Sequence, residues 1–129
     1  MHDQNLAILK GLVCAAWADG AISTAESELL EALIQAFGAT PSEAVEVRQF
    51  ASEHRTIADV PIHELSYNDR RVLLGQAVML TFADGEQHER EKQLIDELCQ
   101  VLRIPSLEAR GIVEAAEQQA KSLLPLLRA

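Results

Sequence analysis

Aromatic residues and cysteines are scarce in this 129-residue chain. It contains three Phe, one Trp and one Tyr, so a core has to be built mainly from Leu, Ile, Val and Ala. Leu and Ala are strong helix formers and β-branched residues do not gather in runs, which favours helices over strands. The two cysteines, Cys14 and Cys99, each lie in an apolar stretch and form no CxxC pair. We expect buried, reduced thiols, although the sequence alone leaves a disulfide between them open.

The chain also lacks a long apolar run and a basic leader. Lys10 and Asp19 interrupt the first apolar stretch, which therefore resembles neither a signal peptide nor a membrane span. We expect a cytoplasmic protein without a membrane span, which can still associate peripherally with a membrane through a partner.

Basic residues are few: 11 Lys and Arg stand against 20 Asp and Glu, for a net charge of -9. Such a chain repels phosphate backbones, so we expect no nucleic-acid partner. The acidity fits a basic protein partner or a bound cation, while its simplest explanation is a solvated acidic surface.

No catalytic set is visible, so the sequence predicts no catalytic residues and no enzyme activity. The four histidines have no zinc-ligand spacing, and the segment from His88 to Glu91 lacks the second histidine of HExxH. The chain has no GxSxG elbow and no glycine-rich phosphate loop.

Helical spacing of apolar residues and repeated capping signals predict an all-α bundle of about six to seven helices. We expect one domain over residues 1–129, with main helices near 5–18, 23–37, 41–54, 67–83, 88–102 and from 107 to a stop or bend at Pro125. Residues 56–66 break the periodicity and predict only a short helical turn. The helix at 67–83 is apolar nearly all round, which places it at the centre. The expected core residues include Leu33, Leu74, Val78 and Leu98.

An internal repeat relates residue n to residue n+65, over about 6–38 and 71–103. Eight of the 26 positions from 12 to 37 are identical to their counterparts without a gap. The informative part is Ala-Asp-Gly, then five residues, then Glu, because any two amphipathic helices share apolar positions. The repeat predicts two equivalent helical hairpins that bury their apolar faces against each other.

The repeated motif supplies the candidate site residues, which are Asp19, Glu26, Asp84 and Glu91, with Gly20 and Gly85 as turn residues. Its spacing matches the second half of an EF-hand loop, but the first ligand positions would be Ala15, Trp17, Leu80 and Phe82, which offer no side-chain oxygen. Three interpretations remain. The carboxylates cap helix N-termini, hold a divalent cation, or dock a partner.

These segments, from Trp17 to Glu26 and from Phe82 to Glu91, resemble the TerB-like family, which includes tellurite-resistance TerB proteins and the N-terminal region of DjlA-type co-chaperones. The resemblance implies an all-helical bundle in a bacterial stress system, with the four motif carboxylates at characteristic acidic positions. We expect no membrane anchor, and since the sequence contains no His-Pro-Asp triplet, we expect no J-domain action on an Hsp70. Gln87 replaces the apolar Ile22 in the second copy.

The resemblance and the composition together lead to one main expectation of function and one alternative. We expect a non-enzymatic interaction or scaffold domain with a protein partner and no cofactor. The alternative is a divalent-cation-responsive protein that uses the paired acidic motifs.

Overall fold

Every element of the described chain is helical. The computed structural model describes residues 3–17, 20, 22–82 and 89–128, without the side chains of 3–4 and 123–128. Over these residues it has no strand and contains α1 (Asp3–Trp17), α2 (Thr24–Ala36), α3 (Pro41–Ala51), the 3-10 helices η1 (Ile57–Asp59) and η2 (Ile62–Glu64), α4 (Tyr67–Thr81), α5 (Glu89–Val101) and α6 (Ser106–Arg128). The predicted all-α fold class is confirmed.

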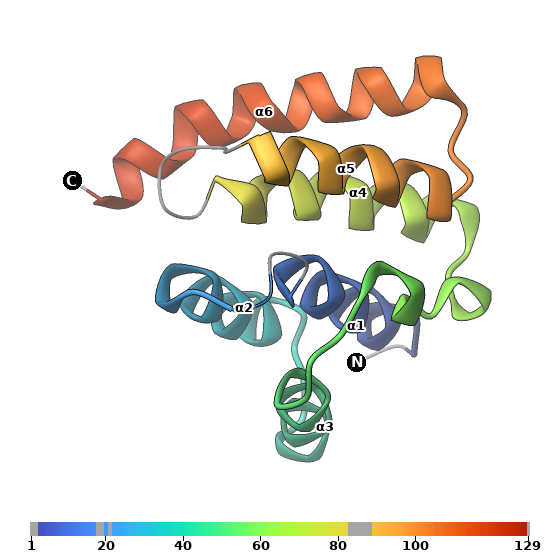
Figure 1. Ribbon diagram of the computed structural model, residues 1–129. Coiled ribbons are helices and arrows are strands. Elements are labelled where there is room, and N and C mark those ends of the chain that lie inside the picture. Colours follow the sequence, from blue (N-terminus) through green and yellow to red (C-terminus); the bar gives the residue numbers. More distant parts are fainter. Residues whose placement is uncertain (1–2, 18–19, 21, 83–88, 129) are drawn as a thin grey trace.

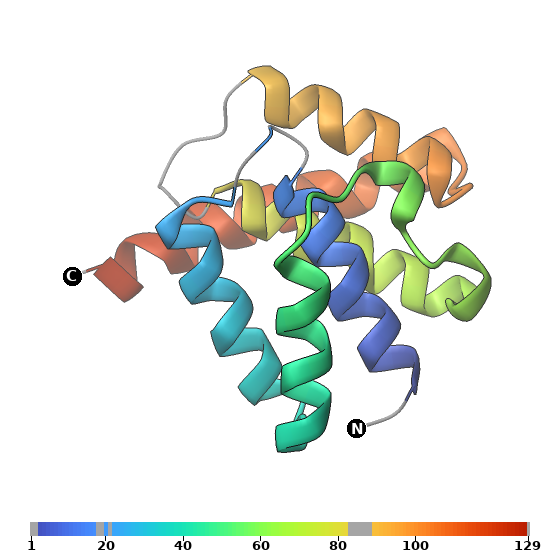
Figure 2. The same cartoon turned by 60° about the horizontal axis from the view of Figure 1, so that its bottom comes forward.

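The helices form two layers, with α4, α5 and α6 in one and α1, α2 and α3 in the other (Figure 1). α1 and α4 pack together at the centre, and α6 covers α4 from the far side. The predicted central position of the helix at 67–83 is therefore confirmed. α1 shares that position, because Leu9, Leu12 and Val13 are completely buried. Viewed after a 60° turn, α2 and α3 lie side by side (Figure 2).

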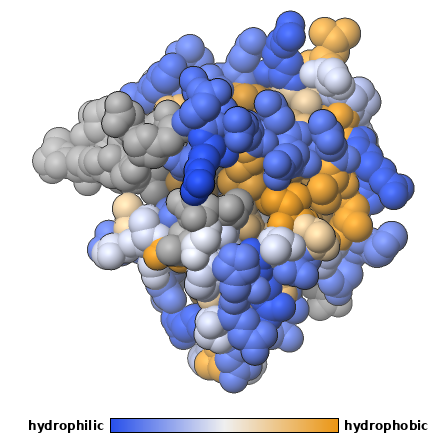
Figure 3. Space-filling model, viewed as in Figure 1, coloured by the Kyte–Doolittle hydropathy of each residue, from blue (hydrophilic) through white to orange (hydrophobic). Residues whose placement is uncertain are grey.

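The predicted core is confirmed at three of four positions. Leu74, Val78 and Leu98 are 0% exposed. Leu33 is only partly buried, because α2 turns Leu30 and Ile34 inward instead. The face in Figure 3 is mostly hydrophilic, with an apolar area where the two layers meet. No helix among the described residues has the length and apolar character needed to cross a lipid bilayer.

Capping boxes begin three helices where the sequence predicts helix starts. The side-chain oxygens of Ser23, Thr40 and Ser66 each accept a hydrogen bond from the backbone N–H three residues later. The acidic side chain at that later position accepts a bond from the cap's own N–H in return. Each box satisfies two N–H groups that the first turn of a helix would leave without partners.

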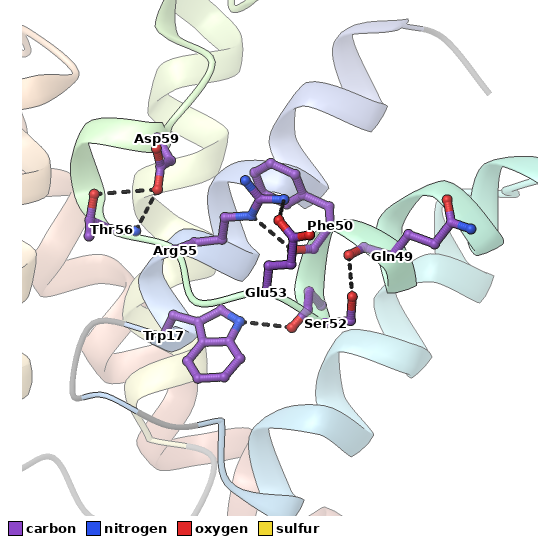
Figure 4. A network of polar contacts seen from close by, with 9 residues as sticks. Trp17, Gln49, Phe50, Ser52, Glu53, Arg55, Thr56 and Asp59 are labelled. Carbon is purple, nitrogen blue, oxygen red and sulfur yellow. Dashed lines mark hydrogen bonds and ion pairs between the residues drawn. The ribbon is translucent and has the colours of Figure 1, made fainter.

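The third helix ends at Ala51, three residues before the predicted end at His54. Side chains take the carbonyl oxygens of its last turn. Ser52 Oγ donates to Gln49 at 2.6 Å, Arg55 Nε to Phe50 at 2.9 Å, and Trp17 Nε1 to the carbonyl of Ala51 at 2.9 Å (Figure 4). These donors replace the backbone N–H groups that a longer helix would have supplied.

Two other segments refine the prediction. Residues 56–66 contain two 3-10 turns instead of one, and they bury Val60 and Leu65 against the core. The last helix does not stop at Pro125, because α6 continues to Arg128. A proline inside a helix costs one backbone hydrogen bond and crowds the preceding turn, which either ends the helix or bends it without ending it.

The helices α2 and α5 have the same length and start 65 residues apart, at Thr24 and Glu89. This is the interval of the sequence repeat. The helices differ in the faces they bury, since α2 buries Leu30 and Ile34 whereas α5 buries Leu94, Ile95 and Leu98. The equivalence of the two hairpins remains a prediction, and so does the assignment of residues 1–129 to one domain.

Both cysteines are free thiols, so the disulfide alternative is wrong. Cys14 is completely buried in α1, whereas Cys99 on α5 is partly exposed, which corrects the expectation that both are buried. Burial raises the pKa of Cys14 to about 12, with a further contribution from the charge of Asp59. Burial also raises the pKa of Cys99, and the negative charge of Asp96 adds a smaller contribution in the same direction.

These environments predict a difference in thiol reactivity. Since the thiolate is the nucleophile, iodoacetamide at neutral pH should label Cys99 slowly and Cys14 far more slowly in the folded chain. Both should react at similar rates in denaturant. Peptide mapping by mass spectrometry over a time course gives the two rates. Equal rates in the folded chain would contradict the burial of Cys14.

Candidate functional site: an acidic pocket between the hairpins

The structure brings two of the predicted site residues together. Glu26 on α2 and Glu91 on α5, which correspond in the sequence repeat, line the same pocket. Asp19, Asp84 and Gly85 lie outside the described residues. Gly20 has a φ of +97°, and its N–H donates to the carbonyl of Trp17 at 2.8 Å. This left-handed conformation at the end of α1 explains the glycine, as predicted.

The pocket lies between the C-terminal ends of α1 and α4 and the first turns of α2 and α5, with a volume of about 200 Å³. Its apolar wall comes from Ala15 and Ala16 of α1, Leu80 of α4 and Leu94 of α5. The polar lining comes from Glu26, Thr81, Arg90, Glu91, Gln93 and Glu97. Three carboxylates against one guanidinium give the described lining a net negative charge.

Glu26 combines its place on the pocket with a structural role. Its Oε1 accepts the backbone N–H of Ser23 at 2.9 Å, and its own N–H donates to Ser23 Oγ at 3.1 Å. The capping interpretation of this glutamate is therefore confirmed. The box fixes the first turn of α2 and holds the Glu26 carboxylate at the N-terminus of its own helix.

The residues of this pocket are better suited to binding a positively charged group than to catalysing a reaction. The lining contains no histidine, cysteine or lysine among the described residues. Across those same residues, no cluster of three or more His, Cys, Asp or Glu side chains is arranged to hold a metal ion. The pocket offers carboxylates at an apolar wall, a combination that fits the aliphatic stem and cationic head of lysine or arginine.

Sequence analysis missed four polar members of the lining: Thr81, Arg90, Gln93 and Glu97. Arg90, Leu94 and Glu97 follow the i, i+4, i+7 spacing of one helical face. That period would have placed Arg90 and Glu97 beside the pocket once Leu94 was assigned to its wall. The repeat gave no such signal, because the counterparts in the first copy are Ala25 and Ala32. Thr81 has a buried hydroxyl that donates to the carbonyl of Val78 at 2.6 Å.

The contribution of the capping box to stability can be measured separately from that of the Glu26 charge. Ser23→Ala should lower the free energy of unfolding by about 0.5–2 kcal/mol, because the backbone N–H of Glu26 in the first turn of α2 loses its acceptor, Ser23 Oγ. Glu26→Gln should be milder, since glutamine also serves in a capping box. Denaturant unfolding followed by far-UV circular dichroism measures both. A larger loss for Glu26→Gln than for Ser23→Ala would show that the carboxylate stabilises the fold mainly by another route.

Comparison with known proteins identifies a family. No curated protein and no solved structure matches the chain. The model of the family described as tellurite resistance protein TerB matches residues 5–113. The match includes both predicted copies of the acidic motif and the helices α2, α4 and α5 that line the pocket. The chain therefore belongs to the tellurite resistance protein TerB family.

Proposed function

We propose that this chain is a non-enzymatic interaction domain of a bacterial, tellurite-resistance-type stress response. It binds a basic side chain of a protein partner in the acidic pocket. The observation that carries the proposal is the position of Glu26 and Glu91. Two glutamates that lie 65 residues apart in the sequence line one surface pocket.

The charge of the molecule supports this type of partner. A net charge of -9 attracts basic surfaces and speeds their encounter. The pocket wall would cover the aliphatic part of a lysine or arginine, and the carboxylates would pair with its charged end. Ion pairs at the pocket would give specificity and a salt-dependent association rate.

A matched pair of double variants tests this role. Glu26→Gln/Glu91→Gln removes two charges from the pocket and leaves the capping box of α2 able to form. Glu28→Gln/Glu89→Gln removes the same charge from exposed positions of the same two helices, outside the pocket. In a pull-down from the native cell with the tagged full chain, the first variant should lose a captured partner by about tenfold or more. Equal capture by both variants would contradict the proposal.

A divalent cation is the alternative ligand, and the same pair of glutamates favours it. Mg²⁺ and Ca²⁺ take carboxylate oxygens. Under this alternative, Asp19 and Asp84 of the repeated motif would complete the ligand set around Glu26 and Glu91. The chain would then bind the cation in place of a protein partner, or it would bind the cation first and the partner afterwards.

Thermal melting distinguishes the two ligands. A cation that binds only the folded chain raises the melting temperature, and the rise grows with the ratio of free cation to its Kd. If the alternative holds, Ca²⁺, Mg²⁺, Mn²⁺ or Zn²⁺ should raise it in the unaltered chain, and Glu91→Gln, Asp19→Asn and Asp84→Asn should abolish the rise. Glu89→Gln should keep it, and a chelator should remove the differences. No rise with any of the four ions would contradict the cation alternative.

A further inference from the structure

Arg90 is the one basic side chain in the described lining of the acidic pocket, where it accompanies the carboxylates of Glu26, Glu91 and Glu97. It lies in the first turn of α5, directly before Glu91, and the i, i+7 spacing places it on the same helical face as Glu97. Its counterpart in the first copy of the sequence repeat is Ala25. Only the second copy therefore brings a positive charge to the pocket.

The charge of Arg90 is not taken up by an ion pair within the described part of the chain. Arg48, Arg55 and Arg71 each pair with a glutamate, at distances between 2.8 and 3.4 Å. Arg90 is exposed and has no such partner among the described residues. Its guanidinium group stays protonated at any physiological pH. The positive charge therefore acts on any ion or side chain that enters the pocket.

The strength of this action depends on the charge of the ligand. The energy between two charges is proportional to their product, so Arg90 repels a divalent cation twice as strongly as the head group of a lysine or arginine. A volume of about 200 Å³ places a bound cation roughly 7–10 Å from a guanidinium on the lining. At that distance in a solvated pocket, the repulsion weakens binding by about two- to fourfold for one charge and about four- to fifteenfold for two.

The other residues of the lining act in the same direction. A divalent cation needs several carboxylate oxygens in direct contact, whereas an ammonium group can pair with one carboxylate and stay partly hydrated. The apolar wall, which includes Leu80 and Leu94, can cover an aliphatic stem that a metal ion lacks. The wall and Arg90 together favour a basic side chain over a metal ion.

We propose that Arg90 determines the specificity of the acidic pocket. Its positive charge disfavours divalent cations and reserves the carboxylates for the single charge of a lysine or arginine from a protein partner. This inference rests on the proposed function of the pocket. It adds the reason why glutamates that could hold Mg²⁺ or Ca²⁺ would select a basic side chain instead.

NMR titration of the full chain measures the two affinities separately. The probes are Ca²⁺ and the tripeptide acetyl-Gly-Lys-Gly-amide, whose one charge is that of its lysine. Both are added at low ionic strength, because salt screens the repulsion. The backbone amide shifts of Glu26, Glu91 and Leu94 report binding at the pocket. Arg90→Gln should strengthen Ca²⁺ binding by about four- to fifteenfold, and tripeptide binding by only about two- to fourfold.

Two further variants control for charge and for position. Lys92→Gln removes the same charge from an exposed position of α5 outside the pocket, and it should change the Ca²⁺ affinity by less than about twofold. Arg90→Lys keeps the charge at the pocket and should leave both affinities nearly unchanged. The proposal would be overturned by equal gains from Arg90→Gln and Lys92→Gln, or by a gain from Arg90→Gln that is no larger for Ca²⁺ than for the tripeptide. A gain from Arg90→Lys as large as that from Arg90→Gln would overturn it as well.

The same titrations separate the role of Arg90 from the proposed function. If the tripeptide shifts no pocket amide in any variant while Ca²⁺ binds more tightly to Arg90→Gln, the proposed function fails and the role of Arg90 stands. If the tripeptide binds at the pocket and Arg90→Gln behaves like Lys92→Gln, the role of Arg90 fails and the proposed function stands. Pocket amides that respond to neither probe in any variant would contradict both.

Discussion

Leu74→Ala should lower the free energy of unfolding by about 2–5 kcal/mol, the range for removing a large aliphatic side chain from a closed core. Leu74 is 0% exposed and lies on α4, the helix that contacts both α1 and α6. A cavity there has walls from two layers of helices, so it cannot close by the movement of one element. Since small domains have a total stability of about 5–15 kcal/mol, this loss would lower the melting temperature substantially.

Two further leucines make the test specific. Leu98→Ala should cost a similar amount, because Leu98 is also 0% exposed. Leu107→Ala is the control, since Leu107 is 85% exposed at the start of α6 and should change stability by less than about 0.5 kcal/mol. Urea unfolding followed by circular dichroism gives all three values. Losses below about 1 kcal/mol at both buried positions would mean that the core is assigned to the wrong faces.

Sequence patterns predicted most of the fold because its helices are specified locally. Ser23, Thr40 and Ser66 each begin a helix through a side chain that acts within three residues. The end of α3 could not be predicted in this way. It depends on a bond from Trp17, 34 residues earlier in the chain, to the carbonyl of Ala51. Contacts between distant segments have no signature in local periodicity.

The error at Leu33 has a similar origin. The repeat equates Leu33 with Leu98, and the two are identical residues on helices of equal length. Burial differs because α2 packs mainly against α1, whereas α5 packs mainly against α4 and η1. Each helix is therefore rotated to a different degree about its own axis. The repeat therefore predicts the same residue at both positions, but the neighbouring helices determine which face of each helix is buried.

The candidate site was predictable in part. The repeat selected Glu26 and Glu91, and the structure places both on one pocket. Their proximity depends on the packing of the first hairpin against the second, which no local pattern describes.

Gly11→Ala should destabilise the chain, although alanine is the better helix former. Gly11 is buried in α1, where a Cβ atom would lie 2.5 Å from Cδ2 and 3.0 Å from Cδ1 of Leu73. Leu73 is itself 0% exposed, so it has no open space to move into. Overpacking costs about 1–3 kcal/mol, whereas replacing a helical glycine gains about 0.5–1 kcal/mol. The cost should exceed the gain.

Gly111→Ala separates these two contributions. Gly111 lies on α6, and an added Cβ would meet nothing within 4 Å. Only the gain in helix propensity should remain there, so this variant should be more stable than the unaltered chain by about 0.5–1 kcal/mol. The difference between the two alanine variants, about 1–3 kcal/mol, then measures the overpacking between α1 and α4.

Leu73→Ala completes the argument, because it removes the atoms that the new Cβ would touch. Alone it should cost about 2–5 kcal/mol by leaving a cavity. Combined with Gly11→Ala, the total loss should be smaller than the sum of the two single losses, since the added methyl group enters the vacated space. Urea unfolding of the four chains gives this coupling as a double-mutant cycle. Additive losses would show that Gly11 and Leu73 do not determine how closely α1 approaches α4.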